Sequence, residues 1–176
     1  MGLDYSYLLY FNRDQLREVL LGVADIALKH TPPTKIHFPD RALDVPLESF
    51  LLEGKVVHYN DPDLGFSTVL VFDNDDAILD WGHGQEVEDP DRSPPGKDRE
   101  NRVSVGYIYL TVYNELPAYD FPGKNLGDLV LFDFGTTGTR MSTLFLYSTS
   151  IRNTFVELLE KHKGVCGVFN KEEEGE

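Results

Sequence analysis

The residues best suited to chemistry lie in one short segment, FDFGTTGTR at residues 132–140. Asp133 follows an apolar run typical of a strand, so its carboxylate could hold a hydrated metal ion. The glycines allow backbone N–H groups to approach phosphate oxygens, and Thr136, Thr137 and Arg140 could add further donors. This segment is therefore a candidate anion or ligand site.

Over these nine residues the chain resembles the first phosphate loop of the superfamily of sugar kinases, heat-shock ATPases and actin. The resemblance implies a nucleotide held between two large domains, with this loop near the start of the first. Too little of the 176-residue chain follows Asp133 to build a second phosphate loop and an adenosine site. We therefore predict an ordinary hairpin loop at 135–139, with glycine where φ is positive, and keep a smaller anion site as the alternative.

A second candidate is the segment 82–101, which is rich in Gly, Pro and charged residues and has no periodicity. We expect a long exposed loop, and loops of that length in compact domains are either functional or disordered. His83 opens this loop and is the histidine best placed for a function. The other histidines are His30, His37, His58 and His162.

No residues show a spacing typical of a known catalytic or metal site. The five histidines lack zinc-binding spacing, and the acidic runs at 61–63 and 73–76 lack the pattern of an EF-hand. We interpret both acidic runs as turns and Cys166 as an inert core thiol. We therefore assign no catalytic residue, no metal ligand and no cofactor.

The charge of the chain restricts its partners. With 30 acidic and 16 basic residues the formal net charge is -14, which repels phosphate backbones and anionic membranes. We expect no nucleic-acid and no membrane partner, whereas a basic protein would be attracted. A single cysteine and the lack of a signal-peptide pattern at the N-terminus indicate a cytoplasmic location.

Periodicity predicts two amphipathic helices. The first begins after Asn12 and ends near residue 30, before two prolines; the second follows a cap at Ser148 or Ser150 and ends before Gly164. Alternating apolar and aromatic residues predict strands, with 103–113 central in the sheet. The expected strands are 3–11, 34–38, 55–59, 66–72, 77–81, 103–113, 129–134, 141–147 and 165–169.

These elements predict one α+β domain over residues 1–170, followed by an acidic disordered tail at 171–176. We expect a mostly antiparallel sheet of six to eight strands with two helices packed on one face, in a split βαβ arrangement.

The sequence does not decide the function. Pronounced acidity without catalytic spacing favours a non-catalytic domain that binds a basic protein, in the manner of small acidic immunity or inhibitor proteins. The alternative is a small enzyme or an anion- or ligand-binding domain that uses the 82–101 loop and the 135–140 turn. The sequence gives no oligomeric state.

Overall fold

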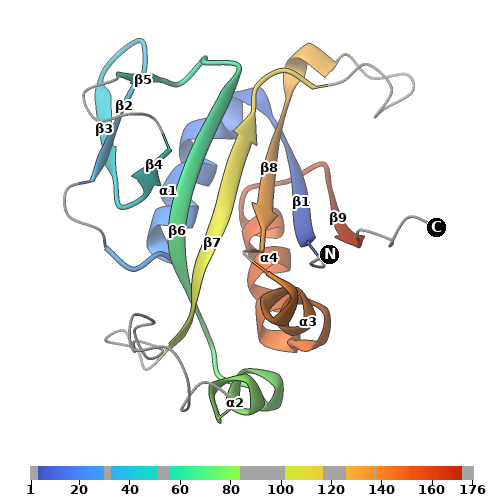
Figure 1. The fold of residues 1–176 in the computed structure, drawn as a ribbon. Coiled ribbons are helices and arrows are strands. Elements are labelled where there is room, and N and C mark those ends of the chain that lie inside the picture. Colours follow the sequence, from blue (N-terminus) through green and yellow to red (C-terminus); the bar gives the residue numbers. More distant parts are fainter. Residues whose placement is uncertain are drawn as a thin grey trace.

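The computed structural model describes residues 4–29, 33–50, 56–83, 102–116, 126–136 and 138–171. These residues form an α+β fold with a large sheet, a small sheet and four α-helices (Figure 1). The predicted fold class is therefore confirmed. None of the helices in this part of the chain has the length and apolar character that a bilayer span needs.

The large sheet has six strands in the order β4-β6-β7-β8-β1-β9, and every neighbouring pair is antiparallel. The predicted strand 103–113 is confirmed as β7 and lies inside the sheet, between β6 and β8. The strands are β1 (Tyr5–Asn12), β4 (Glu48–Ser49), β6 (Asp63–Phe72), β7 (Val103–Tyr113), β8 (Leu129–Gly135) and β9 (Cys166–Lys171).

The small sheet lies beside the outer edge of β6 (Figure 1). Its strand order is β3-β2-β5, with β2 antiparallel to β3 and parallel to β5. These strands are β2 (Thr34–His37), β3 (Ala42–Val45) and β5 (Val57–His58).

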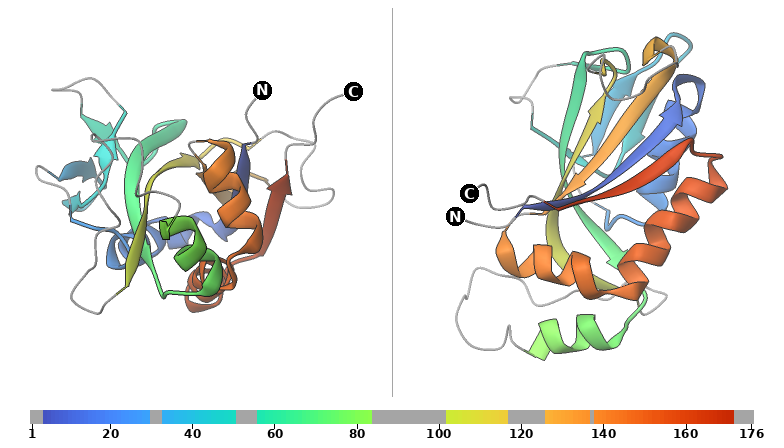
Figure 2. Two further views of the ribbon diagram at one scale, coloured as in Figure 1. Left: turned by 60° about the horizontal axis from the view of Figure 1, so that its bottom comes forward. Right: turned by 90° about the vertical axis from the view of Figure 1, so that its right-hand side faces the viewer.

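Helices α1 and α4 pack against one face of the large sheet, while α3 crosses beneath its lower end (Figure 2). Both predicted amphipathic helices, α1 and α4, are present, and α2 and α3 accompany them. The helices are α1 (Leu16–Asp25), α2 (Asp76–His83), α3 (Thr139–Tyr147) and α4 (Thr149–Lys161), with short 3-10 turns η1 (Arg13–Gln15) and η2 (Leu126–Asp128).

The predicted split βαβ arrangement is formed by β8, the helices α3 and α4, and β9. Strand β1 pairs with β8 on one side and with β9 on the other, antiparallel to both. Strands β8 and β9 therefore run parallel to each other with β1 between them. This arrangement brings the start of β1 beside the end of β8, where the candidate site lies.

Two of the predicted strands are wrong, because residues 77–81 and 141–147 are helical. In α2, Ile78 is buried and Trp81 partly buried while Leu79 is exposed, which is helical spacing. In α3, Met141, Leu144 and Phe145 are buried at positions i, i+3 and i+4. Residues 135–139 therefore connect a strand to a helix and do not close a hairpin.

Other predicted boundaries also shift. Helix α1 ends at Asp25, because the following residues bridge to β6: Leu28 N donates to Val69 O and Val71 N donates to Ile26 O. Lys171 belongs to β9, so it is not part of a tail. Residues 82 and 83, predicted to begin the loop 82–101, are instead the last two residues of α2. The rest of the predicted loop and tail, 84–101 and 172–176, lies outside the described residues.

Asp75 connects the N-termini of α2 and α4. Its carboxylate accepts hydrogen bonds from Ile78 N at 2.9 Å, from Ser150 N at 2.9 Å and from Ser148 Oγ at 2.8 Å. Burial alone would raise the pKa of Asp75, but these hydrogen bonds together lower it. Ser148 in turn accepts a hydrogen bond from Ile151 N and is the N-cap of α4.

We expect Asp75→Ala to lower the free energy of unfolding by about 2 kcal/mol, because two helix starts lose a charged acceptor. The wild-type protein should lose the same contribution in acid. Because the pKa of Asp75 is lower in the folded than in the unfolded protein, its carboxylate stabilises the fold at pH values above the unfolded pKa. This stabilisation is lost as the pH falls through the folded pKa. Urea melts from pH 7 to pH 2 measure both effects. The exposed neighbour Asp73, mutated to Ala, is the control; an equal loss in this variant would contradict the capping role.

Candidate functional site

The large sheet has one face that the helices do not cover. Side chains alternate along each strand, so half of them point toward α1 and α4 and form the core. The opposite side is here called the open face. Helix α3 crosses its lower end, and no other helix of the described residues packs on it (Figure 2). It carries Glu48, Phe50, Asp63, Tyr107, Tyr109, Tyr113, Asp133, Ser6, Leu8 and Val168, as assigned from strand register and burial.

Three aromatic side chains of the open face are strongly exposed to solvent. Tyr107 is 49% exposed, Tyr109 47% and Phe50 52%. The rings of Phe50 and Tyr109 meet edge to face with centroids 5.5 Å apart. Phe50 also lies over Gly65, where a Cβ would be 2.6 Å from the Phe50 ring. Exposed, mutually supported aromatic side chains are typical of protein-binding surfaces.

The charged side chains that the six described strands place on the open face are all acidic. The six strands place Glu48, Asp63 and Asp133 on it. Lys171 is the only Lys or Arg within these strands, and its side chain lies instead over Phe169, which packs among the core aromatics. The strands therefore present an acidic surface without a basic side chain.

A hollow of about 380 Å³ opens where β7, β8 and β1 meet. Asp133 lies in it between Leu8 of β1 and Thr111 of β7, and Gly135 is opposite Ser6 and Tyr109. Because Gly135 has no side chain, it leaves space above the strand. The residues that line the hollow are Asp4, Tyr5, Ser6, Tyr109, Asp133, Gly135 and Thr136.

Asp133 is half-buried, and no described cation compensates its charge. Burial raises the pKa of Asp133, while a hydrogen bond from the Ser6 side chain partly opposes this change. Burial and the charge of Asp133 also raise the pKa of Tyr113. The ion pairs of the described residues, Arg17–Asp40 and Lys161–Asp25, lie elsewhere. The hollow therefore suits a cationic ligand better than a phosphate.

Of the residues predicted for the site, the structure brings Asp133 and Thr136 together at this hollow. Arg140 lies exposed in the first turn of α3. His83 is the last residue of α2, and its side chain lies outside the described part of the structure, as does Thr137.

Thr136 connects β1 to α3 through hydrogen bonds. It is 4% exposed, and its hydroxyl lies 2.6 Å from Ser142 Oγ. Tyr5 N donates to both hydroxyls, at 3.3 Å to Thr136 and 3.1 Å to Ser142. These hydrogen bonds connect the start of β1 to the first turns of α3. The Thr136 hydroxyl is therefore engaged in hydrogen bonds within the protein.

The glycines of the segment differ from the prediction. Gly135 continues the extended strand β8, and Gly138 has φ 162°, which is also extended; among the described glycines only Gly106 has a clearly positive φ, 98°. Gly135 therefore matters for the space that it leaves. The sequence interpretation missed Tyr107, Tyr109 and Phe50, although tyrosines at alternate positions of 103–113 were the available signal.

A scan against protein-family models and searches of curated proteins and of solved structures found no match. The chemistry of the open face and the hollow therefore carries the functional inference.

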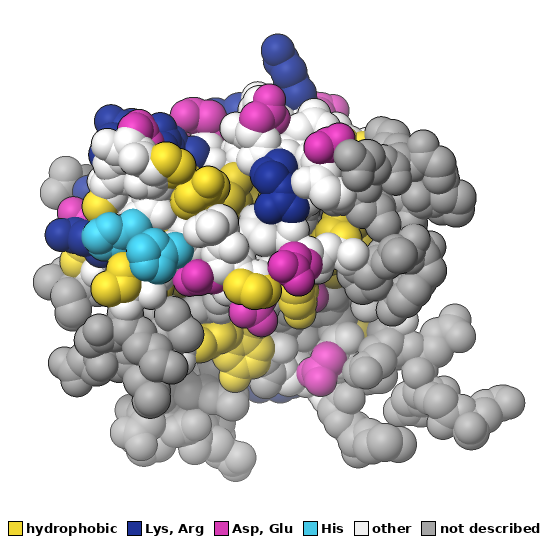
Figure 3. Space-filling view, turned by 90° about the horizontal axis from the view of Figure 1, so that it is seen from above, with side chains coloured by type: hydrophobic (Ala, Val, Ile, Leu, Met, Phe, Trp, Pro, Cys, Tyr) yellow, Lys and Arg dark blue, Asp and Glu magenta, His cyan; other side chains and the backbone are white. Residues whose placement is uncertain are grey.

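A second surface feature is a pair of histidines on the small sheet. His37 of β2 and His58 of β5 are register partners, and their ring centroids are 5.6 Å apart (cyan in Figure 3). Their spacing in the sequence did not predict that they lie together. In the described ranges, no group of three or more His, Cys, Asp or Glu side chains could hold a metal ion.

Proposed function

We propose that this chain is a non-catalytic protein-binding domain that receives a basic protein partner on its open face. The observation that carries the proposal is the exposed pair Tyr107 and Tyr109, set with Phe50 in a sheet face whose strands contribute carboxylates and no basic side chain. Aromatic anchors supply contact area at low cost in conformational entropy.

The charge of the whole chain supports the same partner. A net charge of -14 creates a long-range field that speeds the approach of a basic protein and repels acidic ones. Such a field sets association rate and selectivity, while the aromatic side chains supply affinity. This division predicts binding that weakens with salt and fails when the tyrosines are removed.

The hollow gives one observation in favour of the alternative, a ligand-binding domain. Its volume of about 380 Å³ lies at the small end of the range typical of ligand pockets. A small cationic metabolite would need only the hollow, whereas a protein partner also needs Tyr107, which lies outside it. Tyr107 is the discriminating residue, because it does not line the hollow.

The test is affinity capture from the native cell with the wild-type chain, Tyr107→Ser and Tyr109→Ser, followed by mass spectrometry and by binding measurements on the purified partner. We expect a basic protein whose affinity falls about 30-fold or more in the tyrosine variants, as for interface hot spots.

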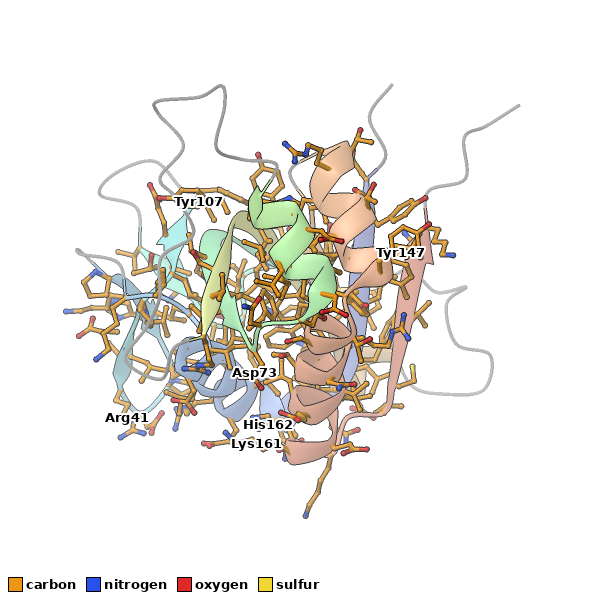
Figure 4. The ribbon with its side chains drawn as sticks, turned by 90° about the horizontal axis from the view of Figure 1, so that it is seen from below. Arg41, Asp73, Tyr107, Tyr147, Lys161 and His162 are labelled. Atoms are coloured by element: carbon orange, nitrogen blue, oxygen red, sulfur yellow. The ribbon has the colours of Figure 1, made fainter. Side chains whose placement is uncertain are left out.

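Tyr147→Ser is the matched control. Tyr147 is 68% exposed on α3, and Figure 4 shows it well apart from Tyr107. This variant should bind within about twofold of the wild type. A partner that is acidic, or one retained equally by Tyr107→Ser and Tyr147→Ser, would show that the open face is not the binding surface.

A further inference from the structure

We infer that the hollow beside Asp133 binds the guanidinium group of one arginine side chain, with Asp133 as the anionic contact and Tyr109 as a wall. The inference rests on the proposed function for the source of this arginine, which is the basic partner. It reverses the chemistry of the phosphate-loop resemblance, because the same segment would receive a cation.

The first support is that the Asp133 carboxylate has a hydrogen bond from Ser6 but no cation beside it in the part of the chain that the structure describes. Asp133 has lost part of its hydration, and the causes that act on its pKa are burial and the hydrogen bond from Ser6. A half-buried carboxylate without a counter-charge costs free energy, and a cation placed beside it recovers part of that cost. Asp4, at the rim of the same hollow, adds a second negative charge.

The second support is the shape of the hollow. Gly135 forms its floor, and the nearest atoms to a Cβ built there would be Tyr109 Cβ and O, both at 4.0 Å. The space above Gly135 is therefore open, beside the half-exposed Tyr109. A volume of about 380 Å³ suits a single side chain and is small for a nucleotide.

Arginine fits this site better than lysine. Its guanidinium group is planar, more weakly hydrated than an ammonium group, and able to stack on an aromatic ring while donating to a carboxylate. The hollow offers this combination in Tyr109 and Asp133. An ammonium group would lose more hydration for the same contact with the carboxylate.

The experiment needs no partner. N-acetyl-arginine amide is titrated into ¹³C,¹⁵N-labelled protein and compared with the neutral citrulline analogue and with N-acetyl-lysine amide. We expect saturable amide shifts at Ser6, Tyr109 and Gly135, with citrulline about tenfold weaker or more and lysine between the two. The carboxyl carbon of Asp133 should titrate at lower pH with the arginine probe bound, because the cation favours the ionised form.

Two variants test the site in different ways. Asp133→Asn keeps the shape and removes the charge, while Gly135→Val fills the space and keeps the charge; each should weaken arginine binding about tenfold or more. Asp63→Asn removes a carboxylate of the same face outside the hollow and should bind within about twofold of the wild type. Thermal melts confirm that each variant is folded.

The outcomes separate this inference from the proposed function. Equal binding of arginine and citrulline, or equal effects of Asp133→Asn and Asp63→Asn, would overturn the arginine site even where a partner still depends on Tyr107. Saturable arginine binding that needs Asp133 and Gly135 supports the site even where no basic partner is captured, and the proposed function then fails alone.

Discussion

Phe155→Ala is expected to lower the free energy of unfolding by about 3–5 kcal/mol, the largest effect of any single substitution considered for this protein. Phe155 projects from α4 and is 1% exposed. Its ring centroid lies 4.6 Å from that of Tyr7 and 4.7 Å from that of Phe134, with Phe145 at 6.0 Å and Phe72 at 6.2 Å.

The size of the effect follows from the surroundings of Phe155. Its neighbours belong to β1, β6, β8 and α3, so truncation leaves a cavity where α4 meets the sheet. Aromatic neighbours are rigid and would close such a cavity only in part, so both the lost burial and the residual cavity destabilise the protein.

Urea and thermal melts measure this prediction, with Val156→Ala as the control. Val156 is the next residue of α4 and is 44% exposed, so its truncation should cost less than about 0.5 kcal/mol. A loss below about 1 kcal/mol for Phe155→Ala would mean that α4 does not pack on the sheet as described.

Asn114→Ala is expected to lower the free energy of unfolding by about 3 kcal/mol, because it leaves two part-buried backbone carbonyl oxygens without their donor. Asn114 is 2% exposed, and its side-chain NH₂ donates to Tyr59 O at 2.9 Å and to Asp61 O at 2.8 Å. Arg13 Nη2 donates to the Asn114 carbonyl oxygen, and Arg13 Nε donates to Gly127 O at 2.7 Å. The pair joins the end of β7 to the turn before β6 and to the start of β8.

Asn114→Asp is the sharper variant of the same test. It keeps the volume of the side chain but places an oxygen against two carbonyl oxygens. We therefore expect the free energy of unfolding at pH 7 to fall at least as far as in Asn114→Ala. In acid the protonated carboxyl group can donate a hydrogen bond, so part of the lost stability should return. Asn12→Ala is the control, since Asn12 is exposed and makes no side-chain cap. Equal stability of Asn114→Ala and Asn12→Ala would refute the network.

These two sites also protect the proposed binding surface. Phe155 holds the helices against the back of the sheet, and Asn114 fixes the end of the strand that carries Tyr107 and Tyr109. Variants at either site should therefore lose partner binding only through unfolding. The open-face variants should lose binding while keeping their stability, because exposed side chains contribute little to folding.

The sequence by itself determined the long, strongly periodic elements. The apolar positions Leu16, Val19, Leu20 and Val23 predicted α1, and all four are buried. Alternation along 103–113 predicted β7, and the polar cap at Ser148 marked the start of α4. Local periodicity and capping suffice for such elements, because each carries enough residues for only one period to fit.

The tertiary structure decided the short segments. Residues 77–81 and 141–147 have too few apolar positions to separate the two periods, and distant contacts made both helical. Asp75 holds α2 and α4 together at their starts, and Ser142 of α3 accepts from Tyr5 N at the start of β1. His162, expected near the end of a helix, is buried against Gly22 of α1, and burial lowers its pKa.

The candidate site belongs to the same category. The sequence singled out Asp133 as a candidate, but only the pairing of β1 with β8 and of β8 with β7 places Ser6 and Tyr109 around it. Strand order depends on which apolar faces can be buried together, and that choice is made over the whole sheet and its helices. The acidity of the chain could therefore be predicted from its composition, whereas the acidic face and the hollow beside Asp133 are formed only by long-range strand pairing.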